Sequence, residues 1–379
     1  FLNNKLINTS LLLVFNEYSL TQINSKGVIM KKELLMGTAL VSTLGAASVA
    51  EAVTATMSGN HQTGIEQESP DSGGDTRSQI NDNNFSVSLS ETTDGGMTIS
   101  SSFMLMNENG SAGDLDAGFS LAFTDGSKLD VINAGNASGS HDISVPGSAG
   151  AEGITVTTAN KAPSGLDFAT AASVFGVEYH TADDFLADGM KMSFSASTDN
   201  GASAGGTYKV DGHLAIGATY VTTAGDTTVT IGAGISEAEG SKTGTTPSVD
   251  EGGVHFGVSA VTGDLTIAVG FADGDSIESV AASTPSQEVD GEVMKAGIKY
   301  VTGDLTFNVG LVSGEGADNA FAGTDTKNDS IDKTSASVSY AVASGITAIV
   351  GYTDTESQNE DSADTTDGSA WYIGANMSF

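Results

Sequence analysis

The sequence predicts an all-β protein, a closed antiparallel transmembrane β-barrel of about 16 strands with short periplasmic turns and long external loops. Three observations predict this fold. Short runs alternate between apolar residues and small or polar residues, which is the pattern of a strand with two different faces. Short turn signals alternate along the chain with long polar loops. An apolar leader is followed by no run of about 18 apolar residues, so a membrane span must be built from strands.

The first element in chain order is a secretory signal. Met30, Lys31 and Lys32 make a positive start, residues 34–49 are apolar or small, and residues 50–52 read Ala-Glu-Ala, the form of a cleavage site. We therefore expect residues 30–52 to be a signal peptide and residues 53–379 to form the barrel. We interpret residues 1–29 as an upstream over-extension of the gene model, with a genuine extension as the alternative.

From Val53 the chain reads as one opening strand, seven hairpins and one closing strand. The stretch VTGDLT at Val261 recurs at Val301, 40 residues later, because each such unit is one hairpin around a Gly-Asp turn. An even number of strands, with short turns at one end and long loops at the other, is typical of bacterial outer-membrane barrels. The expected strands are Val53–Gly64, Asn84–Ser90, Met97–Asn107, Asp116–Phe123, Ser127–Asn133, Val174–Thr181, Gly189–Ser197, Tyr208–Val221, Thr227–Glu237, Val254–Ala260, Leu265–Phe271, Ala296–Tyr300, Leu305–Leu311, Ala336–Ala343, Ile346–Thr353 and Gly368–Phe379.

Aromatic residues support the membrane interpretation. Tyr179, Tyr220, Tyr300 and Tyr340 each precede a short turn and share the phase of the apolar face, as a girdle at the periplasmic boundary requires. Residues of the opposite phase should line the inside of the barrel. We expect the pore wall to carry Lys191, Lys209, Lys295, Lys299, Glu178, Asp211, His213 and His255.

Charge and motifs narrow the function classes. The 379-residue chain has a formal net charge of −34 and no Cys. Such acidity repels nucleic acid and favours cations. The sequence carries no metal-ligand spacing and no P-loop, G-x-S-x-G or H-E-x-x-H motif, so we expect a non-enzyme without a cofactor. Calcium bridging of the acidic external runs Asp325–Asp332 and Asp354–Asp367 stays open beside the simpler interpretation as solvated carboxylates.

Together these features resemble the Gram-negative general porins, particularly the alphaproteobacterial kind. The resemblance is carried by the signal peptide, the strand parity, a long third loop at Ala134–Ser173 and the ending WYIGANMSF. It covers residues 53–379. It implies an outer-membrane homotrimer in contact with lipid and lipopolysaccharide, and a water-filled channel for passive diffusion of small hydrophilic solutes and ions. It also implies that Phe379 is the signal read by the barrel assembly machinery.

The resemblance further implies that the third loop folds into the lumen and constricts it. In this loop we expect Asp142, Glu152 and Asp167 to form an acidic constriction that favours cations. The family often places arginines on the opposite wall, but the mature chain has only Arg77, which we assign to the first loop. Lysines must then form any basic wall, and in this the chain departs from the arginine wall of the family.

Two alternatives stay open. A secreted Gly/Asp-rich calcium-binding β-solenoid or adhesin would show short tandem repeats, whereas the local period here is near 40 residues. A substrate-specific porin would carry aromatic residues on the inward phase, where Tyr372 is one of few. A receptor with a plug domain is disfavoured because no separate globular segment precedes the first strand.

Overall fold

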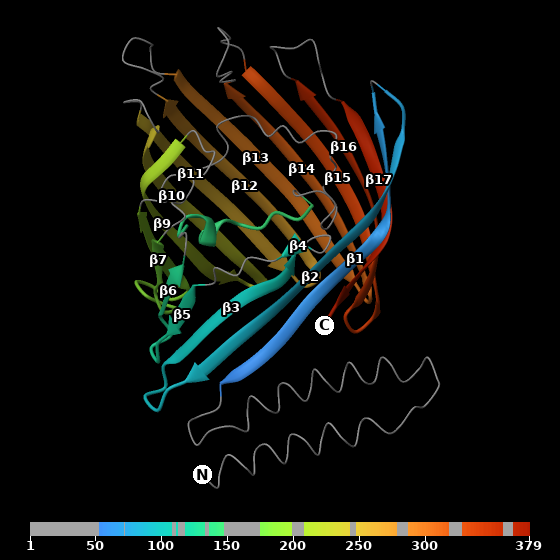
Figure 1. The fold of residues 1–379 in the computed structure, drawn as a ribbon. Coiled ribbons are helices and arrows are strands. Elements are labelled where there is room, and N and C mark those ends of the chain that lie inside the picture. The colour runs from blue at the N-terminus through green and yellow to red at the C-terminus, as the bar shows by residue number, and fades with distance from the viewer. Residues whose placement is uncertain are drawn as a thin grey trace, which may run out of the picture. The chain divides into compact units, whose positions relative to one another are not determined.

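The barrel comprises Thr56–Phe379 in the computed structural model (Figure 1). The structure describes residues 53–71, 73–107, 111–112, 118–132, 136–147, 175–198, 208–242, 248–278, 287–317, 328–358 and 367–379, and at some strand ends, including Tyr208–Asp211, only the backbone. The predicted signal peptide at residues 30–52 and the residues before it lie outside this described part.

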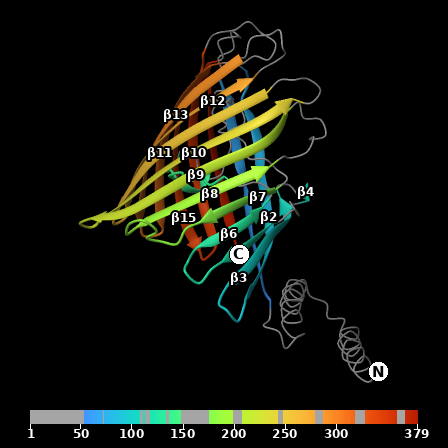
Figure 2. The same ribbon diagram turned by 90° about the vertical axis from the view of Figure 1, so that its left-hand side faces the viewer.

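All strands belong to one antiparallel sheet that closes on itself. Each long strand pairs with its neighbours in sequence, and β1 pairs with β17 from Asn60–Ser378 to Pro70–Gly368. Figures 1 and 2 show the strands tilted together around the barrel. The predicted closed antiparallel barrel is therefore confirmed. The strands are β1 Thr54–Pro70, β2 Thr76–Thr92, β3 Thr98–Asn107, β4 Ser111–Ala112, β5 Phe119–Ala122, β6 Lys128–Ile132, β7 Phe175–His180, β8 Met190–Thr198, β9 Tyr208–Ala224, β10 Thr227–Lys242, β11 Ser248–Thr262, β12 Leu265–Glu278, β13 Gln287–Thr302, β14 Leu305–Ala317, β15 Asn328–Ala343, β16 Ile346–Gln358 and β17 Gly368–Ser378.

The described strand segments occupy 16 positions around the barrel. The two-residue segment β4 pairs with Met106 and Asn107 of β3, whereas β5 pairs with Thr98–Ser100 at the other end of the same strand. The two short segments therefore share one position beside β3. This count confirms the strand number expected from the sequence.

The first two strands are longer than predicted. Residues from Ile65 to Asp82 were expected as a polar loop, but β1 continues to Pro70 and β2 begins at Thr76. Arg77 consequently lies on β2, and its Nε–H donates to Gln67 Oε1 of β1 at 2.9 Å. The prediction was wrong because these residues lack apolar alternation, whereas polar cross-strand pairs also stabilise a strand.

Glycine shapes the short turns between strands. Gly225, Gly263, Gly303 and Gly345 have positive φ angles of 63°, 55°, 59° and 74°, a region that costs glycine no steric strain. The repeated Gly-Asp pairs at Gly263 and Gly303 therefore form the two-residue hairpin turns that the sequence predicts.

The two faces of the sheet differ in chemistry. Large apolar side chains on the outward phase are exposed, as a lipid-facing surface requires. The four girdle tyrosines are among these exposed residues. On the opposite phase, small polar side chains such as Ser193, Ser335 and Thr353 are buried. Within the described residues, no helix has the length and apolarity to cross a membrane. The outward apolar residues include Ile216, Phe256, Val269, Met294, Ile298, Val309, Leu311, Val350 and Ile373.

Candidate functional site

The described part of the third loop, residues 136–147, lies inside the barrel against its wall (Figure 1). It includes the 3₁₀ turn η1, Gly139–His141. Its residues Ala137, Ile143 and Val145 are buried, and Ile143 and Val145 pack on Ala268 of β12. The loop segment therefore narrows the interior on the side of strands β7 to β15.

Glu178 of β7 anchors the start of this segment. Its carboxylate accepts the Asn136 N–H at 3.2 Å and the Ser140 hydroxyl at 2.5 Å. The neighbouring N–H of Ala137 donates to Ser195 Oγ of β8 at 2.9 Å. A buried carboxylate with two hydrogen bonds fixes a loop firmly, because breaking them would leave a desolvated charge.

Glycines of the inner wall make room for the rest of the segment. A Cβ at Gly257 would lie 2.7 Å from Ile143 Cβ, and one at Gly234 would lie 2.8 Å from Ser138 Cα. Such distances are below any real contact, so larger residues would displace the loop. The glycines that contact the loop in this way are Gly217, Gly232, Gly234, Gly257, Gly297 and Gly310, and we call them the glycine track.

The glycine track follows the register of the sheet. Gly217 pairs with Gly234, and Gly297 pairs with Gly310. At the end of the track, the Ser335 hydroxyl donates to the carbonyl oxygen of Gly147. The loop thus crosses the strands on a continuous strip of small side chains.

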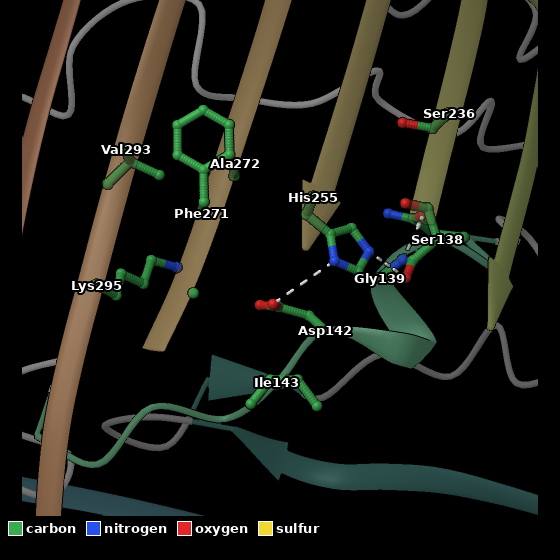
Figure 3. Close-up of a pocket in the computed structure, with 12 residues that line it drawn as sticks. Ser138, Gly139, Asp142, Ile143, Ser236, His255, Phe271, Ala272, Val293 and Lys295 are labelled. Carbon is green, nitrogen blue, oxygen red and sulfur yellow. Dashed lines mark hydrogen bonds and ion pairs between the residues drawn. The ribbon is translucent and has the colours of Figure 1, made fainter. Parts of the chain in front are cut away.

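Beside the loop, a pocket of about 80 Å³ brings charged groups from two sides together (Figure 3). Asp142 comes from the loop, His255 from β11 and Lys295 from β13. The His255 Nε2 atom lies 2.7 Å from the carbonyl oxygen of Ser138, and its Nδ1 lies 3.8 Å from Asp142 Oδ1. Asp142 is 53% exposed. The pocket can therefore offer both a negative and a positive group to a passing solute.

The remaining predicted wall residues lie at different depths. Lys191 shares the inward phase of Ser193 and forms an ion pair with Asp183 at 2.6 Å. Lys299 shares the inward phase of Lys295 on β13. His213 is only 1% exposed on the inner face of β9 and therefore borders little open space.

Four predicted positions cannot be placed in the same way. Glu152 and Asp167 of the third loop lie outside the described residues, as do the side chains of Lys209 and Asp211. The β9 and β10 register shifts between Glu239 and Gly240, which leaves Asp211 as an extra residue. The alternation that assigned Lys209 to the inward face does not continue through such a bulge.

Sequence reasoning missed His141, which lies on η1 and bonds to the wall. Burial lowers its pKa to about 4, and the neighbouring side chains of His180, His255 and Lys191 add to this effect. Within the described residues, no three His, Asp or Glu side chains are grouped so as to hold a metal ion. Sequence reasoning also missed the glycine track. Aligning the predicted strands would have placed glycines of the inward phase side by side, and this pattern could have indicated the track.

A closed barrel with an apolar outer face, a polar inner wall and a loop segment seated inside defines a transmembrane channel protein. Its candidate site is the narrowed interior beside the third loop, where Asp142, His255 and Lys295 line one pocket.

The chain belongs to the Gram-negative porin family, whose model matches residues 37–360. It is therefore an outer-membrane channel. Its fold is similar to that of the anion-selective porin from Comamonas acidovorans, with a TM-score of 0.61 and 12% identity over 86% of this chain and 100% of that one. The outer membrane channel DcaP of Acinetobacter baumannii gives a TM-score of 0.61 and 11% identity, covering 89% and 100% of the two chains. The trimer form of OmpT from Vibrio cholerae gives a TM-score of 0.57 and 13% identity, covering 87% of this chain and 100% of that one. Among curated proteins, none matches the sequence.

Proposed function

We propose that this porin is a passive channel, and not an enzyme, through which small hydrophilic solutes and ions diffuse across the outer membrane. The observation that carries the proposal is the fixed third loop. The segment from Asn136 to Gly147 is bonded to the inner wall at both ends, by Glu178 and by Ser335. A loop tied down in this way narrows the interior by a constant amount, which suits size selection without a moving part.

The channel is tested by reconstituting the mature protein in planar lipid bilayers. We expect discrete conductance steps and entry of small sugars into vesicles that contain the protein. The Asp142→Asn variant should conduct in steps as well, because it changes charge but not the loop seat. Absence of steps from protein shown to be folded would overturn the proposal.

We further propose a preference for cations. The net charge of −34 supports it, because an acidic protein surface raises the local concentration of cations. The pocket itself is nearly balanced, with Asp142 opposite Lys295. Reversal potentials in a KCl gradient measure the preference. We expect Asp142→Asn to weaken it and Lys295→Gln to strengthen it, and a wild-type potential that favours chloride would refute it.

We also propose that three copies assemble in the outer membrane, in contact with lipid and lipopolysaccharide, and that Phe379 guides assembly through the barrel assembly machinery. The trimer form of the Vibrio cholerae OmpT structure supports the first part. Phe379 and Gly59 of β1 donate backbone hydrogen bonds to each other at 3.0 and 3.1 Å. These bonds support a role for the terminal residue in closing the barrel between its last and first strands. Cross-linking of the protein in outer membranes measures the number of copies, and exclusively monomeric protein would contradict the trimer.

A further inference from the structure

The pocket beside the third loop is built by neighbouring strands of the barrel wall and by the loop itself (Figure 3). His255 of β11 pairs with Ala272 of β12, which in turn pairs with Val293 of β13. Lys295 lies two residues along β13 and therefore faces the same side of the sheet as Val293. Asp142 approaches from the loop, and its side chain points toward Lys295. Charged groups of opposite sign thus stand on either side of an apolar floor formed by Ala272 and Val293, which are both buried.

His255 holds the loop with one ring nitrogen and leaves the other without a hydrogen bond. Its Nε2 atom lies 2.7 Å from the carbonyl oxygen of Ser138. Because a carbonyl oxygen only accepts, Nε2 must carry a proton. The Nδ1 atom is buried and has no hydrogen-bond partner among the described residues, and the side chain as a whole is only 8% exposed. Burial disfavours a charged ring, so the ring is neutral and Nδ1 presents a bare lone pair to the pocket.

Two hydrogen-bond acceptors therefore face each other at one end of the pocket. His255 Nδ1 lies 3.8 Å from Asp142 Oδ1, which is too long for a hydrogen bond, and neither atom has a proton to share. A buried acceptor without a donor is costly. A protonated primary amine carries three N–H donors and a positive charge, so it can donate to both atoms at once and neutralise the carboxylate. This end of the pocket thus fits an ammonium group.

The other end of the pocket fits an anion. Within the described part of the chain, no carboxylate is close enough to the Lys295 ammonium to form an ion pair. A simple cation would be repelled by Lys295 and a simple anion by Asp142, so a ligand that carries both charges suits the pocket better than either. Its volume of about 80 Å³ is several times the roughly 10–15 Å³ that one water molecule needs in a cavity. The pocket therefore has room for a ligand of several non-hydrogen atoms.

We propose that this pocket binds a small zwitterionic amino acid, with its ammonium group between Asp142 and His255 and its carboxylate at Lys295. A short apolar side chain of the ligand lies on the floor of Ala272 and Val293. This inference rests on the passive channel proposed above, and it adds a binding station to that channel. Binding that is favourable enough for entry and weak enough for release speeds the passage of this one class of solute at low concentration.

Binding to the folded barrel in detergent solution tests the site without any need for conduction. A saturation-transfer NMR titration with L-alanine should show saturable binding. Propionate lacks the ammonium group and ethylamine lacks the carboxylate, so each should bind roughly tenfold or more weakly than L-alanine, as the loss of hydrogen bonds between charged groups requires. Absence of saturable L-alanine binding to folded wild-type protein would overturn the proposal, because the pocket would then hold water alone.

Variants combined with the truncated ligands test the orientation of the amino acid. Lys295→Gln should weaken L-alanine binding by roughly tenfold but should not weaken ethylamine binding, because ethylamine has no carboxylate to lose. Asp142→Asn should weaken L-alanine binding but not propionate binding for the same reason. Lys299→Gln removes the same charge from the same face of β13 outside the pocket, so this matched control should bind L-alanine as wild type does. Equal losses in Lys295→Gln and Lys299→Gln would refute the site, since the effect would then be one of general charge.

Flux measurements separate this proposal from the proposed channel. Uptake of L-alanine into vesicles that contain the wild-type protein should saturate as its concentration rises, whereas uptake through Lys295→Gln should stay linear over the same range. Both proteins should retain conductance steps in planar bilayers and the heat-dependent gel mobility of a folded barrel. Steps together with linear wild-type uptake would defeat the binding site and leave the channel intact. L-alanine binding without any steps would defeat the channel and leave the binding site intact.

Discussion

Adding one methyl group at Gly297 should disturb the constriction. In the structure, a Cβ at this position would lie 2.9 Å from the carbonyl carbon of Pro146, 3.0 Å from its nitrogen, and closer still to its carbonyl oxygen. Carbon atoms in contact are normally about 3.5–4.0 Å apart, so the loop backbone in Gly297→Ala must move by roughly 1 Å toward the lumen. Overpacking of this kind costs about 1–3 kcal/mol, which shifts the balance between seated and released loop by roughly five- to 150-fold.

Planar bilayer recordings at pH 8 measure this effect. Gly297→Ala should show smaller steps and more frequent closures than wild type. Gly270→Ala is the matched control, because its Cβ would lie 3.4 Å from a methyl group of Val145, at the edge of ordinary van der Waals contact. Both variants should retain the heat-dependent gel mobility of a folded barrel. If Gly297→Ala conducts like Gly270→Ala, the loop does not lie on the glycine track and the reasoning fails.

Three further predictions concern the barrel. Met294 is 61% exposed on the outward face, so Met294→Arg should lower the free energy of unfolding in lipid vesicles by about 2–4 kcal/mol, and an equal loss in Lys295→Arg would contradict the assignment of faces. The Ser127 hydroxyl and N–H donate to Asp125 in the β5–β6 turn and lower its pKa. Ser127→Ala should raise that pKa toward 3.8. The contribution of Asp125 to the stability of the fold, which is present above pH 3.8 and is lost on acidification, should therefore shrink. An unchanged NMR titration of the Asp125 carboxyl group would refute this. Deleting Phe379 removes two backbone bonds to Gly59 and a ring contact with Phe85, so less folded barrel should reach the outer membrane, while Ser378→Ala should assemble normally.

Period-two alternation was sufficient to predict the barrel because lipid imposes the same rule on every strand. Tyr300 and Tyr340 show this: their outward phase and their place before a turn followed from local sequence, and both are exposed in the structure. The extension of β2 back to Thr76 could not be predicted from the same rule, because residues beyond the lipid need no apolar phase. Their strand is specified by partners on β1, such as Gln67 for Arg77.

The site was less predictable because its contacts join residues far apart in the chain. The inward phase of Glu178 follows from alternation on β7, but its bonds to Asn136 and Ser140 depend on the position of loop residues that lie 42 and 38 positions earlier in the chain. For His141 no local pattern exists at all, since η1 is a single turn whose partners Ser193 and Thr219 lie on two other strands. Phase can place a side chain inside a barrel, but it cannot say whether that side chain meets water or a loop.

The repeated hairpin contributes both to the lipid-facing fold and to the inner wall on which the third loop lies. Both copies of the VTGDLT stretch end in Val-Gly, at Gly270 and Gly310, and these glycines pair with Lys295 and Ser335 on the following strands. The same two glycines lie under Val145 and Gly147 of the loop. The turn and the apolar residues of the repeat serve the lipid-facing fold, whereas its last glycine leaves space on the inner wall. The repeat therefore contributes two of the glycines on which the loop lies, whereas the other glycines of the seat stand outside the repeat.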